Sequence, residues 1–116
     1  MNTNLSDKLL VVWTSADREV ALHMVLMYVY NAQLHHWWEQ VTLLIWGPSQ
    51  LLLLRDEEVA EKVHETGQAG VRLIACRGCS EQYGISDALA AHGIEVFGTG
   101  PTLTDWLKSD AKVVTF

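Results

Sequence analysis

The sequence predicts an α/β domain built on a five-stranded parallel sheet. Five short apolar segments alternate along the 116 residues with segments of helix-forming composition, the pattern typical of such a sheet. The chain contains no internal repeat, linker or low-complexity stretch. Because this length suits one domain, we expect residues 1–116 to form a single three-layer α/β/α unit.

The first half of the chain supplies two strands and the helix between them. Apolar runs over 8–13 and 40–46 predict the strands, and the second run stops at a Gly-Pro pair. Residues 18–36 contain neither glycine nor proline, which predicts a helix. Thr14 and Asp17 have the spacing of a capping box, so we expect them to start that helix.

Two helices lead from there to the third strand. A leucine-rich segment over 50–54 predicts a short helix, and the acidic start Asp56-Glu57-Glu58 predicts a longer one that ends near residue 66. Residues 71–76 form a run rich in valine, leucine and isoleucine, which is typical of a buried strand. Helix-forming residues begin again at Ser80.

The remaining segments complete the alternation. A helix over 86–92 ends at a glycine and precedes a fourth strand over 94–97. A second threonine and aspartate pair at capping-box spacing predicts a helix over 102–109. The chain then ends in a fifth apolar strand over 112–116.

The composition of the strands predicts their order. The first three are the most continuously apolar and suit the centre of the sheet, whereas Glu95, Lys112 and Thr115 place the fourth and fifth at its edges. This favours the order 4-3-2-1-5. The alternative, a flavodoxin-like order 2-1-3-4-5, would leave the apolar second strand at an edge. Right-handed crossovers in the favoured order put the first three helices on one face and only the helix over 102–109 on the other.

The charge and hydropathy of the chain exclude several partners. The formal net charge is −6 with eight lysine and arginine residues in all, so we expect no nucleic-acid partner. Residues 1–8 have neither the basic nor the apolar region of an export signal, and no apolar run is long enough to span a membrane. We therefore expect a cytoplasmic protein with no membrane partner.

The helix over 18–36 predicts self-association. Large apolar side chains occupy all of its faces, whereas a helix with one solvated face keeps that face polar. A domain of this size cannot bury them all, and the second face of the sheet has only one short helix to cover it. We therefore expect a homo-oligomer, assembled through this helix and the exposed sheet face.

Two cysteines carry the most distinctive chemistry. Cys76 and Cys79 form a CxxC pair where the third strand turns into a helix. Unpaired N–H groups and the helix dipole at such a corner favour an anion, which lowers a thiol pKa and predicts a thiolate nucleophile. In the cytoplasm this spacing points to redox, sulfur or metal chemistry rather than a structural disulfide. The alternative is that both are small buried hydrophobes.

Loops at the carboxyl ends of the strands form the expected binding site, because ligands of parallel sheets bind there. These loops contain no histidine or paired carboxylate that could catalyse hydrolysis. Their GxG is only a weak match to a dinucleotide-binding motif, and two cysteines are too few ligands for zinc. We therefore expect no cofactor and no metal. Besides catalytic Cys76 and Cys79, we expect ligand contacts from Thr14, Ser15, Gly47, Ser49, Arg77, Gly78, Gly98 and Thr99.

The arrangement resembles the DsrE/DsrF-like family, small cytoplasmic proteins related to sulfur-relay subunits of tRNA thiolation and dissimilatory sulfur oxidation. The resemblance rests on the cysteine after the third strand, on Gly84-Ile85 eight residues later, on Ile45-Trp46-Gly47-Pro48-Ser49 and on the apolar end over 113–116. It implies that Cys76 carries a persulfide, that sulfur donor and acceptor proteins are partners, and that the chain forms trimers or hexamers.

Three functions remain open at this point. A persulfide carrier needs a reactive, accessible Cys76, and would be at most a sulfurtransferase-like enzyme. A CxxC thiol–disulfide redox protein needs Cys76 and Cys79 close enough to bridge. A non-catalytic ligand-binding or assembly module needs neither.

Overall fold

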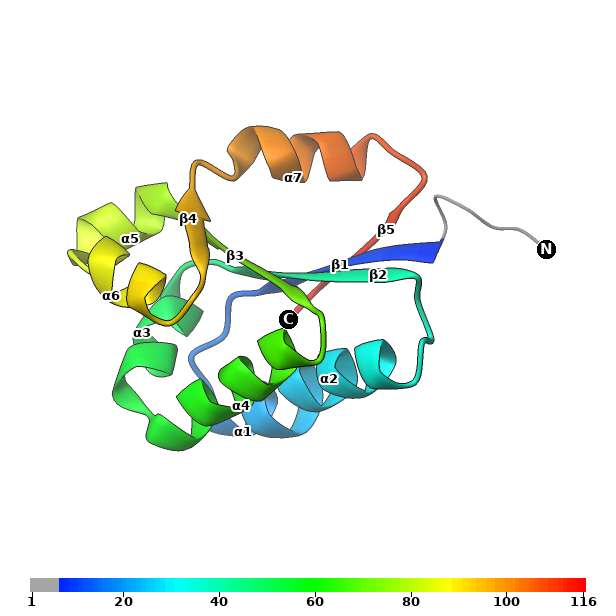
Figure 1. The fold of residues 1–116 in the computed structure, drawn as a ribbon. Coiled ribbons are helices and arrows are strands. Elements are labelled where there is room, and N and C mark those ends of the chain that lie inside the picture. Colours follow the sequence, from blue (N-terminus) through cyan, green and yellow to red (C-terminus); the bar gives the residue numbers. More distant parts are fainter. Residues whose placement is uncertain (1–6) are drawn as a thin grey trace.

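The computed structural model describes residues 7–116 around a five-stranded parallel sheet in the order β4-β3-β2-β1-β5 (Figure 1). The predicted order is therefore confirmed, and the flavodoxin-like alternative is wrong. Along β1 and β2 nearly every side chain is buried, because helices cover both faces of the central strands. The strands are β1 (Lys8–Trp13), β2 (Gln40–Ile45), β3 (Arg72–Cys76), β4 (Glu95–Phe97) and β5 (Lys112–Thr115).

The helix predicted over 18–36 is a run of three helical segments, α1 (Arg18–Val20), η2 (Ala21–Val25) and α2 (Leu26–Leu34). The middle segment is π-helical: the N–H of Leu26 donates to the carbonyl of Ala21, five residues earlier. The predicted helix is therefore present as one continuous helical run, which ends at Leu34 and accommodates one extra residue in this turn.

The residues at the N-termini of the next two helices account for where these helices begin. Helix α3 (Pro48–Arg55) starts two residues before the predicted segment, because Pro48 suits the first turn of a helix. Helix α4 (Glu57–Gln68) starts after Asp56, whose carboxylate accepts the N–H groups of Glu58 and Val59.

The last three helices are α5 (Arg77–Tyr83), α6 (Ser86–Ala91) and α7 (Gly100–Leu107). Helix α5 begins directly after Cys76, three residues before the predicted start, so both cysteines belong to its first turn and cap. Helix α7 begins two residues before the predicted threonine, with Thr99 at its N-cap. The capping box predicted for this helix is therefore wrong.

The predicted capping box of the first helix is also wrong. Asp17 is itself the N-cap residue, and its carboxylate accepts the N–H of Val20 at 3.1 Å. The Thr14 hydroxyl instead donates to the carbonyl of Phe116 at 2.8 Å. This bond joins the loop after β1 to the end of the chain, a long-range contact that capping spacing cannot reveal.

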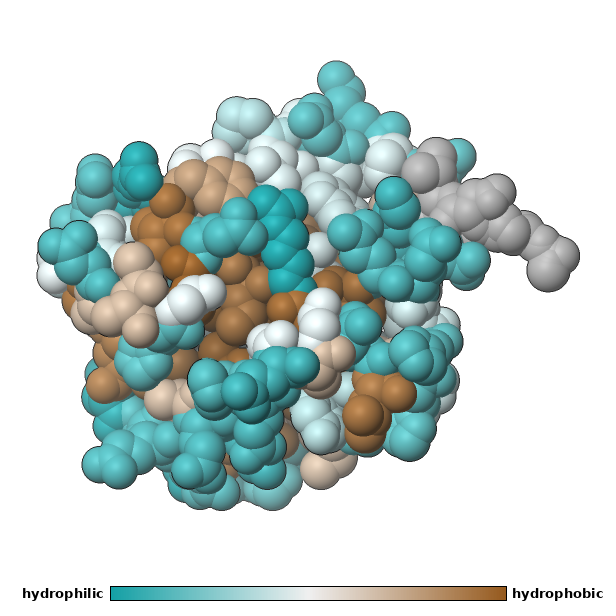
Figure 2. Space-filling model, in the orientation of Figure 1, coloured by the Kyte–Doolittle hydropathy of each residue, from teal (hydrophilic) through white to brown (hydrophobic). Residues whose placement is uncertain are grey.

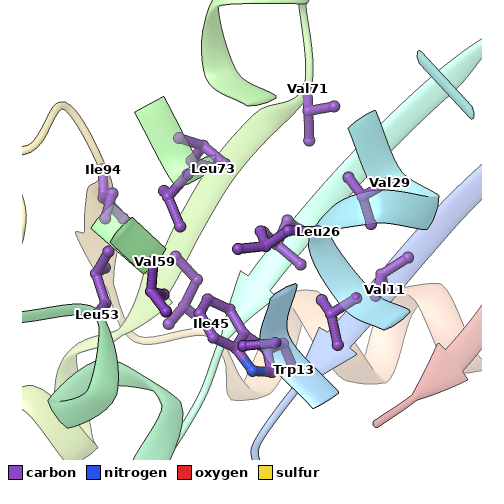
Figure 3. Packing of buried hydrophobic residues seen from close by; sticks show 14 of the residues in the cluster. Val11, Trp13, Leu26, Val29, Ile45, Leu53, Val59, Val71, Leu73 and Ile94 are labelled. Carbon is purple, nitrogen blue, oxygen red and sulfur yellow. The ribbon is translucent and has the colours of Figure 1, made fainter. Parts of the chain in front are cut away.

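The two faces of the sheet are covered unequally, as predicted. Helices α2, α3, α4 and α6 bury the larger core cluster against one face, where Figure 3 shows Trp13, Ile45 and Leu26 packed together. On the other face Figure 1 shows α7, whose Leu103 and Trp106 pack against a smaller cluster. That cluster consists of Leu10, Val12, Leu44 and Ile74.

The surface retains apolar side chains. Met24 and Met27 of the first helical run are 49% and 53% exposed, and Tyr28 is 37% exposed, so one chain does not bury all faces of this run. Figure 2 shows a further apolar area on the side of the molecule where β4 lies. Within residues 7–116 no helix combines the length and the apolar character that a membrane crossing requires.

Candidate active site around the two cysteines

The two cysteines lie at the carboxyl end of β3. Cys76 is the last residue of that strand and the N-cap of α5, with φ −76° and ψ 118°, and Cys79 lies in the first turn of α5. Both are free thiols with partly buried side chains. The strand-to-helix corner expected for Cys76 is therefore present, at the sheet edge where ligands of parallel sheets bind.

Hydrogen-bond donors from two segments surround the Cys76 sulfur. Burial raises the pKa of this thiol, but hydrogen bonds from the Thr99 hydroxyl and from the N–H groups of Cys79, Thr99 and Gly78 lower it further than burial raises it. The pKa of Cys76 therefore lies below the usual range of a cysteine. Because Thr99 is buried at the N-cap of α7, its hydroxyl is held in place against the thiol.

The pKa of Cys79 is shifted in the opposite direction, above the usual value of a cysteine. Burial raises the pKa of its thiol, and so do the negative charge on Cys76 and a hydrogen bond with Cys76, whereas the Gly47 N–H and the Trp46 side chain lower it less. The pair is thus asymmetric: Cys76 favours the thiolate and Cys79 the protonated thiol. Such an arrangement provides one nucleophile and one adjacent proton donor.

A buried glutamine supports the strand end that carries Cys76. Gln50 of α3 has no exposed surface, and its Nε2 donates to the carbonyl of Cys76 at 3.1 Å and to that of Ile45 at 3.0 Å. The amide thus joins the ends of β2 and β3. Its Oε1 is buried without a hydrogen-bond partner among the described residues.

Three of the predicted ligand-binding residues use their hydroxyls within the fold. Thr14 bonds to the carbonyl of Phe116, and the buried Ser49 donates to the carbonyl of Trp13 at 2.6 Å. The Ser15 oxygen accepts the N–H of Asp17 at 3.0 Å. These contacts order the loops after β1 and β2.

The other predicted residues lie nearer the thiols. Gly47, Gly78 and Thr99 contribute N–H groups to them, as described above. Gly98 is exposed beside Thr99. Arg77 directs its guanidinium to the end of β4, where it donates to the carbonyl of Val96 at 2.8 Å. Its contact is therefore with the neighbouring strand.

Sequence reasoning missed Trp46 and Gln50. Trp46 directly follows β2, and a large aromatic residue at a strand end that remains 38% exposed is the signal that could have pointed to it. Gln50 is a polar residue directly before a run of four leucines, next to the sheet edge where the site was expected. In residues 7–116 no three histidine, cysteine or carboxylate side chains gather into a group that could hold a metal ion.

Comparisons with known proteins agree with this architecture. The family model described as the DsrE/DsrF-like family matches residues 7–116. A solved structure of a conserved protein of unknown function from Bacteroides thetaiotaomicron has 30% sequence identity to the chain and a TM-score of 0.93, over 98% of this chain and 100% of that one. None of the curated proteins matches the chain.

Proposed function

Because this chain belongs to the DsrE/DsrF-like family, we propose that it is a persulfide sulfur carrier that uses Cys76. The observation that carries the proposal is the group of donors around the Cys76 sulfur, above all the buried hydroxyl of Thr99. These donors stabilise a thiolate, which is the reactive form in sulfur transfer.

The proposed reaction is two thiol exchanges. In the first, the Cys76 thiolate attacks the outer sulfur of a persulfide on a donor protein, so that a new S–S bond forms at Cys76 and the donor cysteine leaves as a thiolate. In the second, an acceptor thiolate attacks the outer sulfur of the Cys76 persulfide. The outer sulfur is transferred to the acceptor, and Cys76 leaves as a thiolate. Because a thiol with a low pKa is the better leaving group, the donors that activate Cys76 also assist this release.

The partners follow from this chemistry. The chain would bind a persulfidated donor protein and a thiol-bearing acceptor protein. It would act at most as a sulfurtransferase, and thiol exchange needs no resident cofactor. We assign the reaction to the cytoplasm, where thiols are kept reduced.

A second candidate is a CxxC thiol–disulfide redox protein. The contact between the Cys76 and Cys79 side chains favours it, because a disulfide requires two cysteines in close proximity. A non-catalytic binding or assembly module would require neither thiol to react.

We also propose that the protein is a homo-oligomer, a trimer or a hexamer. Met24, Met27 and Tyr28 are exposed side by side on one helical run, and Trp37 just beyond that run is 56% exposed. Complete burial of a large apolar side chain is worth about 1.5–3 kcal/mol, so a second copy of this chain gains stability by covering them. The thinly covered face under α7 offers a second contact.

Mass spectrometry of the protein after incubation with glutathione persulfide tests the proposed function. We expect Cys79→Ser to gain one sulfur atom, mapped to Cys76, and Cys76→Ser to gain none. If the wild type loses two hydrogen atoms and Cys79→Ser gains no sulfur atom, the result would favour the redox candidate. An unchanged mass in every variant would contradict both and leave the non-catalytic module.

A further inference from the structure

The two thiols face each other across the first turn of α5. Cys76 occupies the N-cap, Cys79 lies three residues later, and their side chains are close enough that Cys76 raises the pKa of Cys79. Side chains three residues apart at a helix start are neighbours on the same side of the helix. Between them Gly78 has no side chain to cover the Cys76 sulfur. A sulfur atom bound to Cys76 would therefore have a second thiol beside it.

Cys79 has polar partners of its own. The N–H of Gly47 and the indole N–H of Trp46 approach its sulfur from the loop after β2. Gly47 has a φ of +73°, a left-handed conformation that favours glycine, and this conformation positions its N–H. A cysteine that serves only as a small hydrophobe does not need two donors. These groups are placed to stabilise negative charge that develops on Cys79 as it reacts.

We propose that Cys79 discharges a persulfide held on Cys76 as hydrogen sulfide, so that the protein is a persulfide reductase as well as a carrier. The inference rests on the proposed function, since it requires a sulfur atom on Cys76. It makes Cys79 a catalytic residue with a task distinct from that of Cys76.

The step balances without an external oxidant. The Cys79 sulfur attacks the inner sulfur of the Cys76 persulfide anion, forming the Cys76–Cys79 bond and breaking the bond to the outer sulfur. The electron pair of the broken bond and the proton of Cys79 both go to the outer sulfur, which leaves as hydrosulfide. The outer sulfur is reduced and Cys79 is oxidised to the disulfide level. A dithiol reductant then restores both thiols and becomes a disulfide itself.

The protonated state of Cys79 suits this step. Burial and the neighbouring Cys76 keep the Cys79 thiol protonated, so the nucleophile brings the proton that the departing sulfur needs. The terminal sulfur of the persulfide is the adjacent base. Proton transfer and attack thus involve neighbouring atoms.

A single-turnover experiment without reductant tests the inference. The protein is loaded with one equivalent of glutathione persulfide, released sulfide is trapped with monobromobimane, and the protein is mapped by mass spectrometry. We expect the wild type to release sulfide and form the Cys76–Cys79 disulfide. Cys79→Ser should retain the added sulfur on Cys76 and release sulfide at least about tenfold more slowly. Trp46→Phe, which keeps an aromatic side chain but loses the indole N–H, should release sulfide about threefold more slowly than the wild type.

Each other outcome identifies which proposal fails. Equal retention of sulfur by the wild type and Cys79→Ser would overturn the inference and leave the carrier function intact. A disulfide formed without released sulfide would also overturn it. Absence of sulfur on Cys76 in Cys79→Ser would instead contradict the carrier function itself. Circular dichroism checks that each variant is folded, and Cys79→Ala repeats the measurement with a different side chain.

Discussion

At the scale of single residues, the Thr99 hydroxyl is one of the donors that lower the pKa of the Cys76 thiol. Its hydrogen bond lowers the pKa of the thiol, so the thiolate forms from a lower pH upward than in an ordinary cysteine. Thr99→Val keeps the shape of the side chain and removes this bond, which raises the pKa. We expect alkylation by iodoacetamide near neutral pH to slow by about tenfold, the effect of one pKa unit on the thiolate fraction.

The measurement follows alkylation rate against pH in a Cys79→Ser background, where one thiol remains. In Thr99→Val the rate should rise at higher pH than in the parent protein. Thr104→Val is the matched control, because this threonine lies on the same helix and its hydroxyl bonds to the carbonyl of Gly100, away from the thiols. Superimposable profiles for Thr99→Val and its parent would rule out this role for the hydroxyl.

At the scale of elements, Asp56 connects α1 to α4. Its carboxylate accepts N–H groups at the start of α4 and pairs with Arg18 of α1 at 2.7 Å. The Val59 N–H, followed by Arg18, lowers the pKa of this carboxyl. Because the folded-state pKa is depressed, the stabilisation is complete above the unfolded value near pH 4 and is lost as the pH falls through the folded value.

We expect Asp56→Asn to lower the urea midpoint at neutral pH, because the amide can cap the helix but cannot form the ion pair. As the pH falls through the folded-state pKa of Asp56, the variant and the wild type should converge, since the wild-type carboxyl is then neutral too. Asp105→Asn is the control, an exposed aspartate on α7. A difference between Asp56→Asn and wild type that persists unchanged at the lowest pH would exclude the ionic contribution.

At the scale of the whole molecule, the proposed homo-oligomer depends on the exposed side of the first helical run. Met27 is 53% exposed at its centre, between Met24 and Tyr28. If a second copy covers this side, Met27→Asp places a charge in an apolar interface and should dissociate the oligomer or make it insoluble. Light scattering at micromolar concentration measures the mass of both proteins.

The control for this experiment is Gln82→Asp, which adds the same charge at an exposed position of α5. It should leave the mass of the oligomer unchanged. A wild-type protein that scatters as a 13.0-kDa monomer would refute the interface. Loss of assembly in both variants would show that added negative charge, rather than the position of Met27, disrupts it.

Residue patterns are sufficient to predict the sheet and the position of Cys76. Strands buried on both faces are continuously apolar, and Glu95 and Lys112 suit an edge, so composition distinguishes the three central strands from the two edge strands. The turn from a strand into a helix is likewise a local pattern. It placed Cys76 at the carboxyl end of β3 and predicted its thiolate character.

The groups that surround the two thiols come from segments that are brought together by the tertiary fold. Thr99 reaches Cys76 from the start of α7, and Trp46 reaches Cys79 from the end of β2, although each pair is far apart in the chain. Thr14 has the spacing of a cap but bonds to the last residue instead. Such pairings depend on how crossovers bring strand ends together, and local spacing carries no information about them. The strand order could therefore be predicted from residue patterns, whereas the hydrogen-bond partners of the two cysteines could not.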